Sequence, residues 1–129
     1  MRVSFCIPTH DKNPRCQQYL FDIFHSLSLQ TEMNFNVWVS DHGTSTKVLR
    51  ACEEYDDLFE INYIQNKEKV GNISANTNNA MRLADGEILK IIFSDDMILT
   101  KNLTAELDAA FTEGVEWAVT GFAHTLDGG

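Results

Sequence analysis

The chain has 129 residues, and its 43% hydrophobic and 22% charged residues are typical of a single globular domain with a buried core. Its formal net charge of −9 excludes a broad basic surface, so nucleic acid is not an expected partner. The 3 cysteines show no CxxC spacing, which excludes a zinc knuckle or a disulfide framework and favours free thiols in a reducing compartment.

No run approaches the roughly 20 apolar residues that cross a membrane, so we expect no transmembrane segment. The N-terminus passes directly into a strand-like run and lacks the basic region, apolar core and cleavage site of a signal peptide. The sequence therefore predicts a cytoplasmic protein.

Apolar runs alternate with amphipathic segments along the chain. Strands are predicted, in chain order, at residues 2–7, 35–40, 60–65, 87–93 and 116–122. Helices are predicted between them at residues 16–30, 46–55, 72–84 and 102–113. This alternation predicts one α/β domain of the Rossmann-like three-layer α/β/α type, with a mainly parallel sheet and helices on both faces.

Polar side chains follow four of the five predicted strands. In chain order they are Pro8, Thr9, His10 and Asp11, then Asp41, His42, Gly43 and Thr44, then Asn66, Gly71 and Asn72, and then Ser94, Asp95 and Asp96. The carboxyl ends of parallel strands meet at one edge of a sheet, which is where ligands bind in open α/β folds. We therefore expect a binding site built from these strand ends.

The stretch ILKIIF (88–93) is apolar on both sets of alternating positions, which predicts a strand buried on both faces. Asp95 and Asp96 follow it almost at once, and two neighbouring carboxylates repel unless a positive charge lies between them. Their oxygens suit Mg²⁺ or Mn²⁺, which proteins usually hold through one or two carboxylates together with substrate phosphates. The alternative is a solvated turn that ends the strand.

Four segments appear in the order and spacing seen in family 2 glycosyltransferases of the GT-A fold. They are VSFCIPTH, VWVSDHGTS, NKEKVGNISANTNNAMRLADGE and ILKIIFSDDMIL. The chain thus resembles this family over most of its length, as a single GT-A-like nucleotide-sugar-binding domain at 1–129. The resemblance implies transfer of a sugar, with inversion, from a nucleoside-diphosphate sugar to a hydroxyl of an acceptor sugar or glycan. A UDP-sugar is the donor expected by default.

The resemblance also assigns roles to residues at the strand ends. Pro8, Thr9 and His10 match the first nucleotide-binding loop, with His10 where an aromatic side chain often lies against the base. Asp41 matches the first acid of the family's Asp-Asp-Gly-Ser segment, which reads the base, and His42 stands in place of the second acid. Both are predicted to bind the nucleotide.

Three further residues follow from the same comparison. Asn78 matches the Asn of an Arg-Asn pair and is predicted to bind the nucleotide, although Thr77 stands where the family often has Arg. Asp96 is the predicted ligand of Mn²⁺ or Mg²⁺. Asp95 is predicted to contact ribose, the sugar or a metal-bound water.

Family members are usually much longer than this chain, and their second half supplies the acceptor site and the general base. We therefore expect the acceptor half to be missing from 1–129, and no catalytic base can be named. The alternative to a transferase is a truncated or degenerate module that binds nucleotide and metal without turnover. A phosphoacceptor receiver domain is disfavoured because the acid pair follows the fourth strand, and a dinucleotide-binding domain because no GxGxxG is present. An exposed sheet edge would favour a homo-oligomer.

Overall fold

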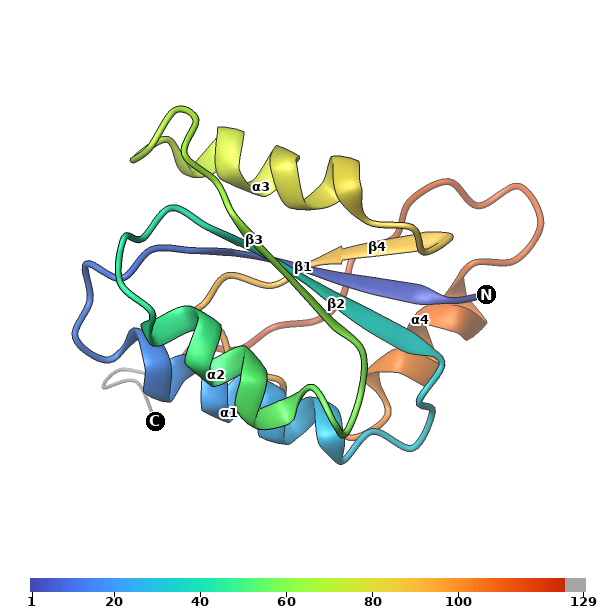
Figure 1. Cartoon of the computed structure of the whole chain (residues 1–129). Helices are drawn as coiled ribbons and strands as arrows, with labels where there is room; N and C mark the ends of the chain where they lie inside the picture. The colour runs from blue at the N-terminus through green and yellow to red at the C-terminus, as the bar shows by residue number, and fades with distance from the viewer. Residues whose placement is uncertain (125–129) are drawn as a thin grey trace.

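The structure, a computed structural model, describes residues 1–124 and contains one sheet with helices on both faces (Figure 1). Its elements are β1 (Val3–Thr9), α1 (Cys16–Ser28), β2 (Phe35–Asp41), α2 (Lys47–Tyr55), β3 (Ile61–Gln65), α3 (Ile73–Leu83), β4 (Ile88–Ile91) and α4 (Leu103–Ala110). All four predicted helices and the first four predicted strands are present, and their ends differ from the predicted ones by at most 3 residues.

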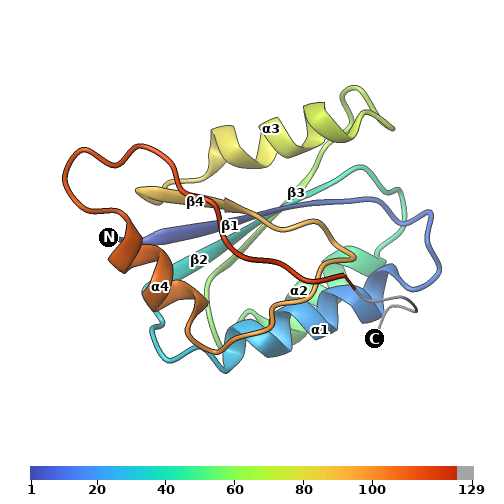
Figure 2. The ribbon, with the colours of Figure 1, turned by 180° about the vertical axis from the view of Figure 1, so that it is seen from behind.

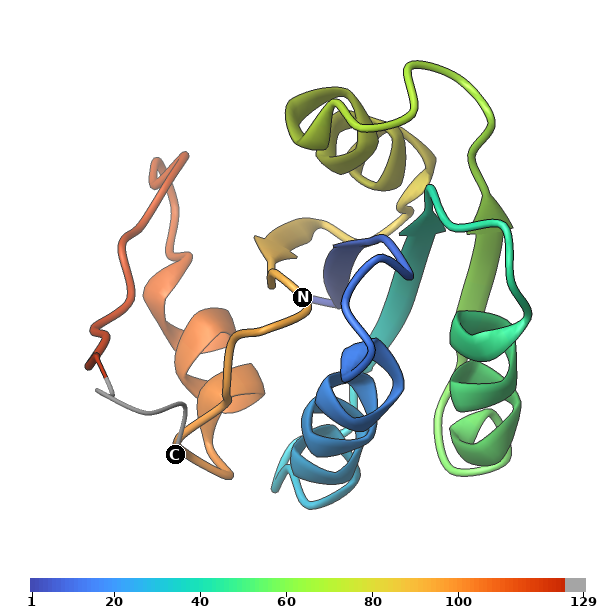
Figure 3. The ribbon, with the colours of Figure 1, turned by 90° about the vertical axis from the view of Figure 1, so that its left-hand side faces the viewer.

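The strand order is β3-β2-β1-β4, and every neighbouring pair is parallel. All four carboxyl ends therefore lie at one edge of the sheet, on the left of Figure 1. Figure 3 looks onto this edge and shows α3 on one side of the sheet and α1 and α2 on the other. The three-layer α/β/α prediction is confirmed.

The helices are held by apolar faces whose spacing could be read from the sequence. In α1, four side chains at helical spacing are completely buried: Leu20, Ile23, Phe24 and Leu27. The ring of Phe59 lies 6.2 Å from that of Phe24 and 5.3 Å from that of Phe35, which joins α1 to β2. Each large apolar side chain buried in this way contributes about 1.5–3 kcal/mol, so the core gives the strand ends a rigid support.

β4 departs from its prediction. It is only 4 residues long, and Leu89 and Phe93 are 39% and 41% exposed, so the prediction of a strand buried on both faces is wrong. The physical reason is its place in the sheet, because β4 is an edge strand that pairs with β1 alone.

The prediction of a fifth strand at 116–122 is also wrong. Figure 2 shows this segment as a connection without a strand arrow, and Trp117, Val119 and Phe122 are 77%, 80% and 80% exposed. A hydrogen bond of 3.0 Å from Lys90 Nζ to Thr120 Oγ1 connects it to β4. Its alternating apolar pattern would favour a strand only if its backbone were paired and one face covered, and neither condition holds in the part of the chain that the structure describes.

α4 lies near the amino ends of the strands, away from the predicted binding edge. The Gln30 side chain accepts a hydrogen bond from the Thr104 amide at 3.1 Å and donates one to Thr100 O at 2.8 Å, which ties α4 to the end of α1. None of the helices within residues 1–124 combines the length and the apolar character needed to cross a membrane.

Candidate functional site

The strand order reverses direction between β1 and β4, because β2 and β3 lie on one side of β1 and β4 on the other. The pairing of β1 with β4 ends at Cys6 and Ile91, with one further bond of 2.9 Å from Ile92 N to Cys6 O. β1 continues to Thr9 without β4, and Pro8 has no N–H that would be left unpaired there. The two strands thus separate at a topological switch point, the usual position of a ligand in such a sheet.

Asp41, at the end of β2, is completely buried, yet its carboxylate has three hydrogen-bond donors. Thr9 Oγ1 and the Gly43 amide donate to Oδ1 at 3.2 and 2.7 Å, and the Tyr63 hydroxyl donates to Oδ2 at 2.7 Å. An ionised carboxylate has about four acceptor positions, so about one remains. Asp41 therefore fixes three neighbouring segments in addition to any contact with a ligand.

Tyr63 was not predicted to belong to the site. Burial, and then its hydrogen bond to the Asp41 carboxylate, raise the pKa of Tyr63, because both disfavour a second negative charge. The sequence could not show this contact, because the contact depends on the register of β2 with β3. That register pairs Tyr63 with Val39 and brings the Tyr63 hydroxyl to Asp41.

Asp11 supports the turn that follows β2. Its Oδ2 accepts hydrogen bonds from the backbone amides of Ser45 at 2.8 Å and Thr44 at 3.2 Å. Hydrogen bonds from the side chain and backbone of Ser45 are the main reason that the pKa of Asp11 is lowered to about 2. Gly43 is required here, because a Cβ on it would lie 2.7 Å from Asp11 Cγ and 2.9 Å from Asp41 Oδ1.

The first loop is only partly as predicted. Pro8 and Thr9 are the last two residues of β1 and are buried, whereas His10 begins the loop and is partly exposed. Neither ring nitrogen of His10 has a hydrogen-bond partner among residues 1–124, although Nδ1 lies 3.3 Å from Asp11 Oδ1. The ring lies 6.4 Å from that of His42, edge to face. His10 thus places two buried ring nitrogens without a hydrogen-bond partner at this edge of the described chain.

His42 is used differently. It is 3% exposed, with Nε2 placed 3.0 Å from Glu68 O and Nδ1 placed 3.4 Å from Gly71 N. Both nitrogens thus face the loop between β3 and α3. That His42 also contacts a nucleotide stays a prediction.

α3 presents different asparagines to the sheet and to solvent. Asn76 is 2% exposed, and its amide donates to Thr9 O at 3.1 Å and to Ser40 O at 2.9 Å. Asn78 is exposed, and it lines a hollow of about 160 Å³ together with Asn66, Glu68, Lys69, Ala75, Asn79 and Arg82. The structure therefore brings Asn76, which was not a predicted site residue, into the network of strand ends and leaves Asn78 outside it. Helical spacing from the apolar Ala80 back to Asn76 was the signal that could have found it.

Asp95 and Asp96 are exposed just beyond β4, on the opposite side of the switch point from His10. Asp96 Oδ2 accepts a hydrogen bond of 3.1 Å from the Phe93 amide, which closes a turn and directs the chain away from the sheet. Neither carboxylate forms an ion pair among residues 1–124.

The residues present fit a divalent metal shared with a substrate. Within the described part of the chain no three His, Cys, Asp or Glu side chains gather as a complete metal site. A Mg²⁺ or Mn²⁺ ion completed by phosphates and water needs only one or two carboxylates, and the exposed pair Asp95–Asp96 supplies oxygen donors of that kind.

A parallel sheet with this strand order, and with acids at both sides of its switch point, defines the class of α/β domains to which the N-terminal part of GT-A transferases belongs. The chain matches the model of Glycosyl transferase family 2 over residues 4–128, and it belongs to that family. The resemblance seen in the sequence is therefore confirmed.

Solved structures agree with this assignment. S. aureus TarS 1–349 matches with a TM-score of 0.70 and 27% identity over 85% of this chain. The complex of TarS 1–349 with UDP-GlcNAc matches with a TM-score of 0.69 at the same identity and coverage. The mannosyltransferase PcManGT from Pyrobaculum calidifontis, in complex with GDP-Man and Mn²⁺, matches with a TM-score of 0.61 and 25% identity over 78% of this chain.

The chain spans only 31%, 30% and 29% of the lengths of these three structures, respectively. A search of curated proteins found no match.

Proposed function

We propose that this chain is the donor-binding part of an inverting, metal-dependent glycosyltransferase that takes its sugar from a nucleoside-diphosphate sugar. The observation that carries the proposal is the switch point, where the unpartnered nitrogens of His10 lie on one side and the exposed pair Asp95–Asp96 on the other. TarS was solved with UDP-GlcNAc and PcManGT with GDP-Man and Mn²⁺, which supports a nucleotide-sugar donor and a divalent metal.

The proposed roles follow from the contacts. His10 lies against the base, and the buried Asp41 supports the base site from below by ordering Thr9, Tyr63 and the turn at 42–45. Pro8 and Thr9 set the floor of the site as buried residues of β1, and Asn78 contributes from the side of α3. UDP is the nucleotide we expect first, because TarS is the better match.

Asp96, with Asp95 beside it, would hold Mn²⁺ or Mg²⁺. When bound, the metal neutralises the charge that develops on the departing diphosphate. The carboxylates themselves bind and orient the diphosphate through that charge, so they are not free to act as the general base. The acceptor is a sugar or glycan hydroxyl, and the group that deprotonates it is not assigned to any residue of this chain.

Isothermal titration with UDP-GlcNAc and GDP-Man, each with and without Mn²⁺, tests the proposal. We expect binding of one donor that depends on Mn²⁺ and is lost in Asp96→Asn. The matched control is Asp57→Asn, which changes an exposed acid in the turn after α2. If neither donor binds, with or without Mn²⁺, the proposal is contradicted. Release of the nucleoside diphosphate on incubation with acceptor glycans distinguishes a transferase from the alternative, a module that binds nucleotide and metal without turnover.

A further inference from the structure

His42 stands where the family usually has an acid, and it is nearly inaccessible at 3% exposure. Its ring is enclosed by the segment 66–72, which connects β3 to α3 and is called here the β3–α3 loop. The ring meets this loop at two backbone groups, Glu68 O at 3.0 Å and Gly71 N at 3.4 Å.

These two partners determine the protonation of the ring. A carbonyl oxygen can only accept and an amide N–H can only donate, so Nε2 carries the hydrogen and Nδ1 accepts. The Asn66 side chain, 3.2 Å from Nε2, has another acceptor in Asn76 Oδ1 at 3.2 Å. His42 is therefore a neutral ring that joins two points of one loop to the end of β2, a task that a carboxylate, which only accepts, could not perform at Glu68 O.

The β3–α3 loop needs such support because its backbone is unfavourable in isolation. Lys69 has a φ of 52°, a left-handed conformation that is uncommon for a residue with a side chain, whereas Gly71 adopts its φ of 91° without that cost. Lys69 directly follows Glu68, and Gly71 is itself the second contact of His42. The loop is also tied to β2 at its start by the bond of 2.7 Å from Asn66 N to Asp41 O, and it is closed internally by the bond of 3.0 Å from Asn72 N to Lys69 O.

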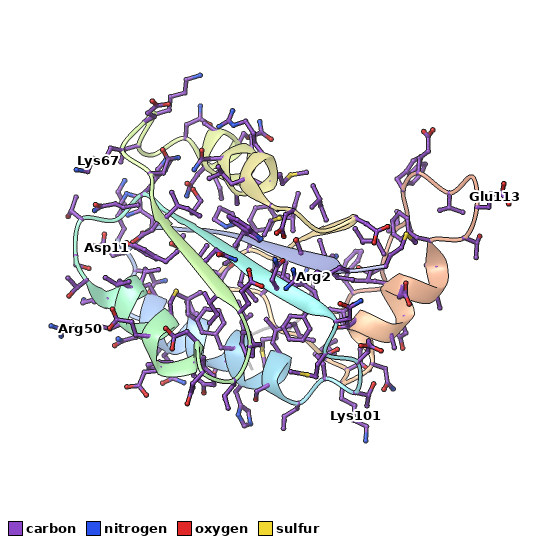
Figure 4. All side chains as sticks on the ribbon, turned by 45° about the vertical axis from the view of Figure 1, so that its right-hand side comes forward. Arg2, Asp11, Arg50, Lys67, Lys101 and Glu113 are labelled. Atoms are coloured by element: carbon purple, nitrogen blue, oxygen red, sulfur yellow. The ribbon has the colours of Figure 1, made fainter. Side chains whose placement is uncertain are left out.

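The loop lies at the end of the molecule where the nucleotide is proposed to bind. His42 directly follows Asp41, the last residue of β2, and its ring lies 6.4 Å from that of His10. Figure 4 shows Asp11, from the loop after β1, and Lys67, from the β3–α3 loop, at the same end, with Lys101 and Glu113 at the opposite end. The two loops thus flank the end of β2.

We propose that His42 is a positioning residue, which holds the β3–α3 loop as one wall of the base pocket and acts through that loop rather than by touching the nucleotide. This inference rests on the proposed function.

Amide exchange of the free protein tests the support of the loop without any nucleotide. We expect His42→Leu to speed exchange of the Gly71 and Asn72 amides by about tenfold or more, while amides of β1 and β2 are unchanged. His42→Gln, whose amide can both donate and accept, should exchange at an intermediate rate. Unchanged exchange of the loop amides in His42→Leu, in a sample that unfolds cooperatively, would overturn the proposal.

Binding then tests the role in the site. In the presence of Mn²⁺, His42→Leu should weaken UDP or GDP binding by about tenfold and leave pyrophosphate, which has no base, within about twofold of the native chain. His42→Gln should recover part of the loss. An equal loss for pyrophosphate, or no loss for the nucleotides, would overturn the proposal. If the native chain binds no nucleoside diphosphate at all, the proposed function is wrong, and so is the role of the β3–α3 loop as a wall of the base pocket. The exchange experiment still decides whether His42 holds the loop.

Discussion

Removal of the Tyr63 hydroxyl measures how firmly the buried Asp41 is held. Tyr63→Phe deletes the donor of the bond of 2.7 Å to Asp41 Oδ2, on a carboxylate that has no exposure to water. A hydrogen bond to a charged group contributes about 1.5–3 kcal/mol, and two of the three donors remain, so we expect a loss of about 1–2 kcal/mol. An unfolding entropy of about 2.1 cal/mol/K per residue, over 129 residues, converts this into a fall in Tm of about 4–7 °C.

Thermal unfolding followed by circular dichroism is the assay, and Tyr55→Phe is the control. The Tyr55 hydroxyl forms no hydrogen bond within residues 1–124, so its loss should change stability by less than about 0.5 kcal/mol. Above about pH 10 the unfolded chain loses the tyrosine proton, but the raised pKa of Tyr63 keeps it in the folded chain. The native chain should therefore lose stability there, and the difference between it and Tyr63→Phe should shrink. The same Tm for Tyr63→Phe and Tyr55→Phe at neutral pH would refute this account of Asp41.

Four further predictions follow from other contacts. Gly43→Ala should cost about 1–3 kcal/mol in urea unfolding, because its Cβ would meet Asp11 and Asp41, whereas Gly121→Ala, with open space around it, should cost little. Asp11→Asn should flatten the loss of stability between about pH 4 and pH 2, since the lowered pKa of Asp11 stabilises the native chain above that range. Asn76→Ala should lower stability by about 2–4 kcal/mol, while Asn78→Ala should leave the Tm unchanged and weaken nucleotide binding in titration calorimetry. Concentration-dependent association should be visible by analytical ultracentrifugation and should fall in the double variant Trp117→Ser and Phe122→Ser, because both side chains are at least 77% exposed.

Local pattern was sufficient to predict much of the fold. The spacing of Leu20, Ile23 and Phe24 located α1 and its buried face, and the alternation of strands with helices predicted the parallel sheet. The sequence could not show which strand lies at an edge, because strand order depends on how the helices cross the sheet. That is why ILKIIF was expected to be buried on both faces and why 116–122 was expected to be a strand.

The candidate site was predicted at the correct edge but not in its internal connections. Residues that follow strands, such as Asp41 and Asp96, could be grouped because parallel strands share a carboxyl edge. The bonds of Tyr63 and Asn76 depend on strand register and helix rotation, which no motif records. The resemblance to the family supplied Asn78, which the structure leaves exposed and outside the network around Asp41.

The central claim is that the acids at the switch point bind a nucleoside diphosphate together with a metal. Thermal unfolding with UDP, GDP, CDP and TDP, each with and without Mn²⁺, tests it most directly. A ligand at 100 times its dissociation constant adds about 2.7 kcal/mol, which corresponds here to a rise in Tm of about 10 °C. We predict a rise of this kind for one nucleotide, only with Mn²⁺, that is lost in Asp96→Asn and kept in Asp57→Asn. No rise with any nucleotide, from a cooperatively folded sample, would contradict the claim.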